Sequence, residues 1–569
     1  MARPQRTLPE PAAMIVAPQP EPVDVGATVL RAGGNALDAT IAAALVQGVV
    51  DPLMCGLGGF ALLHLAAPGT EPVVYDGLGR VPGSATPDLW ADRVLGETSD
   101  GFGFIVRDFV NESGPTSVLV PGTLRTLADA HATHGRLPWD DLVRPAIALA
   151  RAGWLVRPHV ATVFTQDERR YGRMDFAEKL ALTPDGRRLY LRDDGTPKRL
   201  GERVVNPELA EVLDLVARDP NSLYEGELAG VVADAVTRDG GLLTVSDLRS
   251  FHTQQCASMR AGYRGWGVGV PAPPGGGTYL LQALALLERL LPAPPDVCHN
   301  DAEHLRLLAE VMKTALRDRD RYAGDPDFPG DPAPAAGAGE APPDLLDPAR
   351  LDALADAIRS GQRVRIERLP AGDSRHTTHV SAVDADGMTV ALTHTLGNPS
   401  GYLPPGTGFM LNGGMSTFDP RPGRANSLAP GKRRLSTMSP TLLFDADDPA
   451  RPVGTLGAPG ASWIGPGILQ VVSNLLDWGM GTQEAVAAPR IAATGDAIDI
   501  SNRIPTCVED ALTADGYEVR RSPLSYAFAG VHAITAFDGR LRGGADPQRD
   551  GYAAGVPADE LGVAHSQYK

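Results

Sequence analysis

Three side chains with hydroxyl or imidazole groups are brought together by one predicted hairpin. The stretches THVSAV and MTVALTHT alternate β-forming residues, and the Asp-Ala-Asp-Gly sequence at 384–387 between them is typical of a turn. A turn there pairs Val383 with Met388. Counting outward places Thr377 opposite His394, or opposite Thr395 if the hairpin contains a one-residue bulge. A threonine hydroxyl is a weak nucleophile that needs an adjacent base, so this end of the hairpin is a candidate catalytic centre. An ordinary threonine-rich strand pair is the alternative.

Other segments must form the frame that holds this hairpin. Residues 26–50 read as two short helices around a Gly33-Gly34 break, and the second is apolar on nearly every face, which predicts a buried helix. ALLHLAA and VVYDG predict a pair of strands. Further helices are expected to begin at Pro121-Gly122 and to cover residues 304–322. The sequence GTLGAPGASWIGPGILQVVSNLLDWG reads as strand, glycine turn and helix.

The composition is that of an ordinary globular chain with excess negative charge. The 569 residues suffice for one large domain or two to three ordinary ones, and 52 basic against 69 acidic residues give a formal net charge of −17. Such a surface repels phosphate backbones and anionic lipid, which argues against nucleic acid and membrane as partners. The longest apolar stretch, residues 36–50, is too short to span a bilayer. The N-terminal residues lack a signal-peptide core, so we expect a cytoplasmic location.

The motifs predict neither a cofactor nor a metal. Four cysteines occur without CxxC spacing, and His, Asp and Glu do not cluster as metal ligands would. The Gly-Gly-Gly-Thr sequence at 275–278 lacks the Lys-Ser/Thr of a phosphate loop. We therefore expect a site built only from protein groups.

Eight short motifs lie along almost the whole chain. They are GGNALDA at 33–39, DPLMCGLGGF at 51–60, PGTL followed by GRLPW, EVMKTALRDRDRYAGDPDF at 310–328, TTHVSAVDADGMTVALTHTL at 377–396, LSTMSPT, APGAS and GGADPQRDGYAAG. Together they resemble the motifs of the γ-glutamyltransferases (glutathione hydrolases), members of the N-terminal-nucleophile (Ntn) hydrolase superfamily. Any one of these motifs is weak, but about eight in family order leave little room for coincidence.

The resemblance implies an α+β fold, a four-layer αββα sandwich formed by two subunits cut from one precursor. Cleavage between His376 and Thr377 would give a large subunit, 1–376, and an intertwined small subunit, 377–569. Thr377 would then be the nucleophile, and its own α-amino group, with an ordinary pKa of about 7.7–8.0, would be the base. Before cleavage that nitrogen is an amide, so the precursor should be inactive.

The resemblance also assigns roles to other positions. Thr395 matches the threonine that orients the nucleophile. Ser436 and Thr437 match a pair that holds the substrate's α-carboxylate. Gly460 and Ala461 match a pair whose backbone N–H groups form the oxyanion hole, and such donors contribute roughly 2.7–4 kcal/mol each in comparable acyl-transfer sites.

Departures from the family cluster at the residues that recognise glutamate. The family usually has a D-x-R-E-x-A-P stretch. In this chain Leu78 occupies the position of its arginine, and Arg80 lies two residues further on. The asparagine expected two residues after the second threonine is Gly397, with Asn398 next to it. The stretch that holds the substrate's amino group has Gly414 and Thr417 in place of its polar ligands. Compensating cations could be Arg80 or members of the basic segment that follows, Arg421, Arg424 and Lys432-Arg433-Arg434, although a solvated loop is the simpler interpretation of the last run.

Three functions are compatible with this pattern. The first is an amidase that hydrolyses or transfers a γ-glutamyl-type acyl group from a small-molecule amide such as glutathione. The second is a hydrolase of the same fold for a non-glutamyl small acid amide, such as an oxamate-like compound or a biosynthetic intermediate. The third is a catalytically inactive paralogue that serves as a binding protein.

Overall fold

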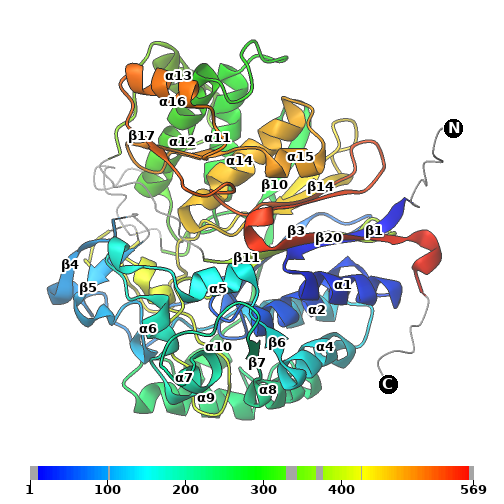
Figure 1. Ribbon diagram of the computed structural model, residues 1–569, viewed down its shortest axis with the longest axis vertical. Helices are drawn as coiled ribbons and strands as arrows, with labels where there is room; N and C mark the ends of the chain where they lie inside the picture. Colours follow the sequence, from blue (N-terminus) through cyan, green and yellow to red (C-terminus); the bar gives the residue numbers. More distant parts are fainter. Residues whose placement is uncertain (1–9, 100–102, 329–342, 367–375, 425, 563–569) are drawn as a thin grey trace.

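Two antiparallel sheets lie face to face at the middle of the molecule (Figure 1). The computed structural model describes residues 10–99, 103–328, 343–366, 376–424 and 426–562. Within them, the first sheet has seven strands in the order β20 (Gly551–Pro557), β1 (Pro11–Pro18), β11 (Thr378–Val383), β12 (Thr389–Thr395), β2 (Phe60–Ala66), β3 (Val73–Gly77) and β8 (Gln254–Ala257). The second has six in the order β19 (Arg542–Ala545), β18 (His532–Thr535), β14 (Pro452–Gly457), β13 (Thr441–Phe444), β10 (Trp266–Val270) and β9 (Met259–Tyr263).

The predicted hairpin forms, but its turn is one residue longer than expected. Val383 pairs with Thr389 and not with Met388, and Thr378 pairs with His394. The Asp384 carboxylate causes the difference, because it accepts the N–H groups of Asp386 and Met388, both at 3.0 Å, and so closes a wider turn. The register therefore matches the bulged alternative, which places Thr377 level with Thr395.

Helices cover the outer face of the first sheet. The predicted break at Gly33-Gly34 separates α1 (Pro20–Arg31) from α2 (Ala36–Val50), and α2 packs directly on β11 and β12. Its apolar surface is buried nearly all round because α1 and α4 cover what the sheet does not. The other helices of this half are α3 (Thr123–His134), α4 (Trp139–Ala152), α5 (Pro158–Phe164), α6 (Phe176–Leu180), α7 (Pro184–Tyr190), α8 (Pro207–Arg218), α9 (Glu227–Arg238) and α10 (Val245–Ser250).

A second helical layer covers the six-stranded sheet (Figure 1). It contains α11 (Gly277–Leu290), α12 (Ala302–Tyr322), α13 (Pro348–Arg359), α14 (Ile464–Leu476), α15 (Thr482–Ala487) and α16 (Thr506–Ala514). The architecture is the four-layer αββα sandwich that the family resemblance implied. Outside the two main sheets, short strands of the described residues form small sheets: β4 (Val94–Glu97) with β5 (Phe104–Val106), β6 (Trp154–Leu155) with β7 (Arg203–Val204), and β15 (Ile491–Ala492) with β16 (Ile498–Ile500) and β17 (Val519–Arg521).

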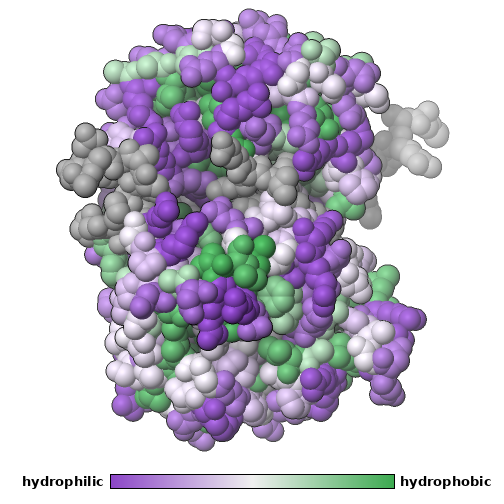
Figure 2. Space-filling view, turned by 90° about the vertical axis from the view of Figure 1, so that its left-hand side faces the viewer, coloured by the Kyte–Doolittle hydropathy of each residue, from purple (hydrophilic) through white to green (hydrophobic). Residues whose placement is uncertain are grey.

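On the face shown in Figure 2, hydrophilic residues cover much of the surface, and a cluster of hydrophobic residues lies just below mid-height. No helix among the described residues is long and apolar enough to cross a membrane.

Candidate active site

The hydroxyl groups of Thr377 and Thr395 meet at the open end of the β11–β12 hairpin. Thr377 directly precedes β11, and its hydroxyl donates to the hydroxyl oxygen of Thr395 at 3.1 Å. That oxygen also accepts the backbone N–H of Gly397 at 2.8 Å, which fixes its orientation. Both threonines are almost fully buried, at 5% and 1% exposed. The pairing that the family resemblance implied is thus present in the uncleaved chain.

The third polar group of the predicted cluster, His394, lies on the opposite face of the sheet. Successive side chains in a strand alternate between faces, so His394 and Thr378 point toward α2, where both bond to Gln47. His394 therefore cannot serve Thr377 as a base. His379 is on the inner face and bonds to Thr393, which is a structural contact between the two strands of the hairpin.

The glycine turn after β14 faces the peptide bond that precedes Thr377. Gly460 has φ of +135° and Ala461 has φ of +49°, and together they lead into the N-terminal end of α14. The Gly460 N–H donates to the carbonyl oxygen of His376 at 3.0 Å. The partial positive charge at a helix N-terminus adds to that donor, so the turn can stabilise negative charge on the His376 oxygen.

Thr377 has an unusual backbone conformation at the same bond. Its φ is +83°, a region that β-branched residues seldom adopt because Cβ then crowds the backbone. Such a residue stores of order 1–3 kcal/mol and persists only where its surroundings hold it in place.

Positive charge surrounds His376, the residue before Thr377. Its ring is fully buried and packs edge-on against Phe176 with ring centroids 5.6 Å apart. Burial lowers the pKa of the His376 imidazole well below its usual range, and nearby cations lower it further: Arg173, Lys179, Arg549 and Arg434. The imidazole is therefore neutral and is unsuited to act as a base at ordinary pH.

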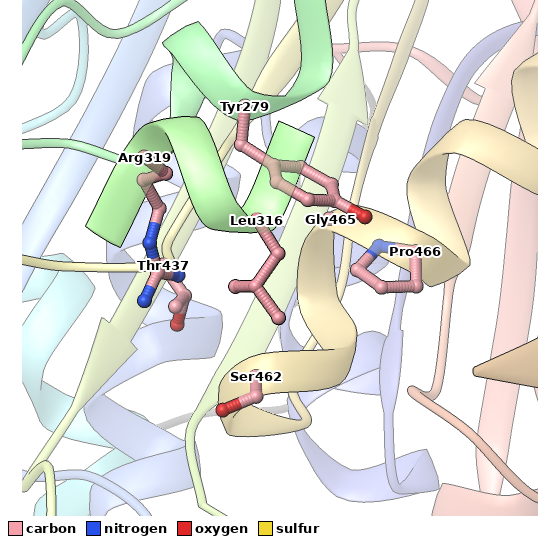
Figure 3. A pocket seen from close by; sticks show the side chains of 8 residues that line it. Tyr279, Leu316, Arg319, Thr437, Ser462, Gly465 and Pro466 are labelled. Atoms are coloured by element: carbon pink, nitrogen blue, oxygen red, sulfur yellow. The ribbon is translucent and has the colours of Figure 1, made fainter. Parts of the chain in front are cut away.

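Ser436 and Thr437 lie between the glycine turn at Gly460-Ala461 and the helices of the second layer. The Ser436 hydroxyl oxygen accepts the N–H of Met438 at 3.1 Å, which closes a tight turn. Thr437 lines a small pocket, with room for about one water molecule, together with Ser462, which directly follows the glycine turn (Figure 3). The rest of the lining comes from Gly276, which precedes α11, and from α11, α12 and α14: Tyr279, Leu316, Arg319, Gly465 and Pro466.

Arg80 and Leu78 do not rebuild the family's arginine site. The Arg80 guanidinium lies over the ring of Phe251, 5.5 Å from its centroid, and donates to the carbonyl of His252 at 3.4 Å. Leu78 is buried in the same apolar cluster as Phe60.

Asn398 takes part in a buried polar network that the sequence did not indicate. Its side-chain oxygen accepts from the Lys179 ammonium at 2.6 Å, and its side-chain nitrogen donates to Glu112 at 3.0 Å. These contacts occupy both ends of the Asn398 amide. Lys179 and Glu112 belong to no recognisable motif, and only the fold brings them beside the hairpin.

Gly414 and Thr417 belong to a short 3₁₀ turn that offers little to a substrate ammonium group. A Cβ at Gly414 would lie 2.5 Å from a methyl carbon of Leu119, so no larger polar residue fits there without a shift. The Thr417 hydroxyl donates to the carbonyl of Gly414 at 3.1 Å.

The Lys432-Arg433-Arg434 run is buried, so its interpretation as a solvated loop is wrong. The three residues are 1%, 3% and 3% exposed. Arg433 is paired with Asp76 at 2.8 Å and Asp325 at 2.6 Å, and Lys432 donates to the carbonyl of Ser427. The acidic partners of Arg433 lie far away in the sequence, so a local pattern cannot reveal them.

The other arginines of the basic segment differ in exposure from Arg434. Arg424 is exposed, and Arg421 is paired with Asp419 and Glu97. Arg434 lies inside, with its guanidinium over the ring of Phe60 at 4.7 Å from the centroid.

The described residues contain no group of three or more His, Cys, Asp or Glu side chains that could hold a metal ion. The groups gathered at Thr377 are two hydroxyls, backbone N–H donors and cations. A hydroxyl can attack a carbonyl carbon, and the N–H donors and cations can stabilise the negative oxygen that results. This is the chemistry of acyl transfer.

Known proteins resemble the chain over nearly its whole length. The family model described as Gamma-glutamyltranspeptidase matches residues 23–556. The Acylase ACY 1 proenzyme of a Pseudomonas species is 36% identical over 547 residues, which cover 95% of this chain and 92% of that protein. The glutathione hydrolase proenzyme of Bacillus subtilis is 30% identical over 563 residues, covering 95% and 91%. The crystal structure of a cephalosporin acylase from Bacillus halodurans superposes with a TM-score of 0.80 at 25% identity, covering 97% of both chains.

Proposed function

The chain belongs to the gamma-glutamyltranspeptidase family, and from that premise we propose that it is a self-cleaving acylase. The precursor is cut between His376 and Thr377, and the new N-terminal threonine hydrolyses the amide of a small carboxylic acid. Residues 1–376 and 377–569 are then its two subunits.

One observation carries the proposal: the His376 carbonyl oxygen accepts the Gly460 N–H while Thr395 orients the hydroxyl of the next residue. Attack of the Thr377 oxygen on the His376 carbonyl carbon places negative charge beside that N–H. The C–N bond then breaks, and the proton lost by the hydroxyl goes to the departing nitrogen. An ester now joins His376 to the Thr377 oxygen.

Backbone strain favours this step. The positive φ of Thr377 stores of order 1–3 kcal/mol, and breaking the peptide bond releases it. Water then hydrolyses the ester, which leaves a carboxylate on His376 and a free hydroxyl and amine on Thr377.

The same groups then serve catalysis. The α-amine, with an ordinary pKa of about 7.7–8.0, accepts the hydroxyl proton as the Thr377 oxygen attacks a substrate amide, and passes it to the leaving nitrogen. The substrate carbonyl occupies the place of the His376 carbonyl at the Gly460 N–H. Water releases the acid from the threonyl ester and regenerates the enzyme.

The acyl group of the substrate lacks an α-amino group in this proposal. Leu78, Gly414 and Thr417 stand where an arginine and two polar ligands would hold a γ-glutamyl group, and Leu119 fills the space beside Gly414. The acylase relative supports the same reading. The glutathione hydrolase relatives support the alternative, a γ-glutamyl group held by other residues.

Two matched anilides distinguish these alternatives. γ-Glutamyl p-nitroanilide and glutaryl p-nitroanilide share the amide and the distal carboxylate, and only the first carries an amino group. We expect kcat/KM to be at least about tenfold higher for the glutaryl compound, because an ammonium group removed from water without a polar partner weakens binding. The kcat/KM for glutathione should be at least about a hundredfold below that of a family member with the intact arginine.

Thr377→Ala, which cannot cleave itself, is the inactive control for both anilides. Equal or faster turnover of the γ-glutamyl compound would assign a glutathione-hydrolase activity instead. Cleaved protein that hydrolyses no amide of a panel of small acids would overturn the acylase proposal.

A further inference from the structure

We propose that a pocket between α12 and the segment that follows α13 binds inorganic phosphate. The pocket has a volume of about 160 Å³, far more than one water molecule needs. The described residues that line it include none of the groups gathered at Thr377. The inference therefore goes beyond the proposed amidase activity and does not depend on it.

The pocket is formed by residues from both sides of position 376. Lys313 comes from α12, and Arg363 and Arg365 lie in the segment after α13. Asp496 precedes β16, and Tyr517 lies between α16 and β17. Figure 1 shows α12, α13, α16 and β17 together at one end of the molecule. A ligand in this pocket would contact residues of both proposed subunits.

Two cations at the pocket have no carboxylate partner among the described residues. Lys313 is 3% exposed, and its ammonium group donates to the backbone carbonyl of Asp496 at 2.7 Å. The Arg363 guanidinium lies over the ring of Tyr517, 4.0 Å from its centroid, and donates to the backbone carbonyl of Asp515. A buried charge without a counter-ion is costly, so both cations favour an anion in the space that they line.

The carboxylates at the pocket are already engaged. Asp496 is paired with Arg365 at 3.2 Å, and Glu518 is paired with Arg520 at 2.6 Å. Neither carboxylate neutralises Lys313 or Arg363 by direct contact. The pocket therefore has an excess of positive charge, although the chain as a whole carries a net charge of −17.

The pocket also gives a role to the motif at 310–328, which the proposed catalysis does not use. Glu310 and Lys313 are three residues apart on α12 and so lie on the same side of the helix. Glu310 accepts the Tyr517 hydroxyl at 3.0 Å and the Val364 N–H at 2.9 Å, and these bonds fix two walls of the pocket. Lys313 is left to face the cavity.

The arrangement of the cations suits phosphate better than a carboxylate. Burial lowers the pKa of the Lys313 ammonium group, and the nearby charges of Arg365 and Arg363 lower it further. Glu310 and Asp496 act in the opposite direction. The three cations are thus close enough to share one ligand. A phosphate has four oxygens and can accept from all three, and arginine guanidinium groups match phosphate oxygens well.

Isothermal titration calorimetry with inorganic phosphate at constant ionic strength tests the site in the purified protein. We expect a Kd of about 1 mM or tighter, the affinity that two to three charge-assisted hydrogen bonds can supply. Arg363→Met and Lys313→Met should each weaken binding by about 10- to 100-fold, the effect of losing one such bond. Acetate, which has only two oxygens, should bind at least about tenfold more weakly than phosphate.

Arg359→Met removes an arginine four residues before Arg363 and outside the pocket, and it should bind phosphate as the wild-type protein does. If Lys313→Met fails to fold, Arg363→Met and Arg365→Met decide the outcome, because Arg365 is largely exposed. A wild-type protein without saturable binding up to about 10 mM phosphate would overturn the inference. Equal phosphate affinity in wild type and in folded Arg363→Met and Arg365→Met would also overturn it, whatever the anilides show about amidase activity.

Discussion

At the scale of single residues, Thr377 differs from an ordinary buried threonine in three ways. Its hydroxyl bonds to a second hydroxyl, its φ is +83°, and the carbonyl before it accepts the Gly460 N–H. Each feature acts on the same peptide bond. Together they support the proposal that this weak nucleophile attacks there without a histidine base.

Removing the partner hydroxyl should separate folding from chemistry. Thr395→Ala should fold normally but lose turnover by about 10²–10³-fold, the effect typical of losing a preorganised polar group. Thr395→Ser keeps the hydroxyl and should retain most of the rate. Steady-state kinetics of the cleaved enzymes measures the difference, and wild-type turnover in Thr395→Ala would show that this hydrogen bond has no catalytic role.

The pH profile should reveal the base. Burial and the cations that lower the pKa of His376 also disfavour a charged ammonium on Thr377. The amine pKa should therefore fall below its ordinary value of about 7.7, and kcat/KM should reach its plateau at a correspondingly lower pH. A rise in kcat/KM centred above pH 8 would contradict this account of the electrostatics.

At the scale of elements, the sequence predicted the hairpin, the break between α1 and α2, and the turn before α14, because each depends on local alternation, apolar periodicity or glycine. Of the two registers that the sequence allowed, the structure has the bulged one, because the Asp384 carboxylate widens the turn. The sequence could not predict that the Lys432-Arg433-Arg434 run is buried. That outcome depends on Asp76, Asp325 and Phe60, which lie more than a hundred residues away.

The glycine turn gives a prediction at this scale. Gly460→Ala adds a Cβ about 3.0 Å from Ala529 at a φ of +135°, so the turn must shift and its N–H should move away from the His376 carbonyl. We expect uncut precursor to accumulate on a denaturing gel. Gly539→Ala introduces a side chain at a positive φ of +78° with no neighbour within 4 Å and should be cut normally. Normal cutting of Gly460→Ala would exclude the turn from self-cleavage.

At the scale of the whole molecule, the two proposed subunits cannot be independent domains. Strands β11 and β12 lie between β1 and β2 in one sheet, and β13 pairs with β10 in the other. Residues from both sides of position 376 therefore share each sheet and each apolar core. Separating them would expose both sheets.

The pieces should accordingly stay together after cleavage. On gel filtration under native conditions, the 376- and 193-residue pieces should elute in the same peak, and heating should give one cooperative transition. A mixture of the two pieces that separates without denaturant would contradict the interleaved sheets.

The mass of the purified protein tests the central claim most directly. We predict two chains, the smaller of which begins Thr377-Thr378-His379, whereas Thr377→Ala should remain a single chain of 59.8 kDa. Mass spectrometry of the intact protein and N-terminal sequencing of the small piece measure both. A wild-type protein that is fully active as one uncut chain, or one that is cut at another bond, would contradict the assignment of Thr377 as an N-terminal nucleophile.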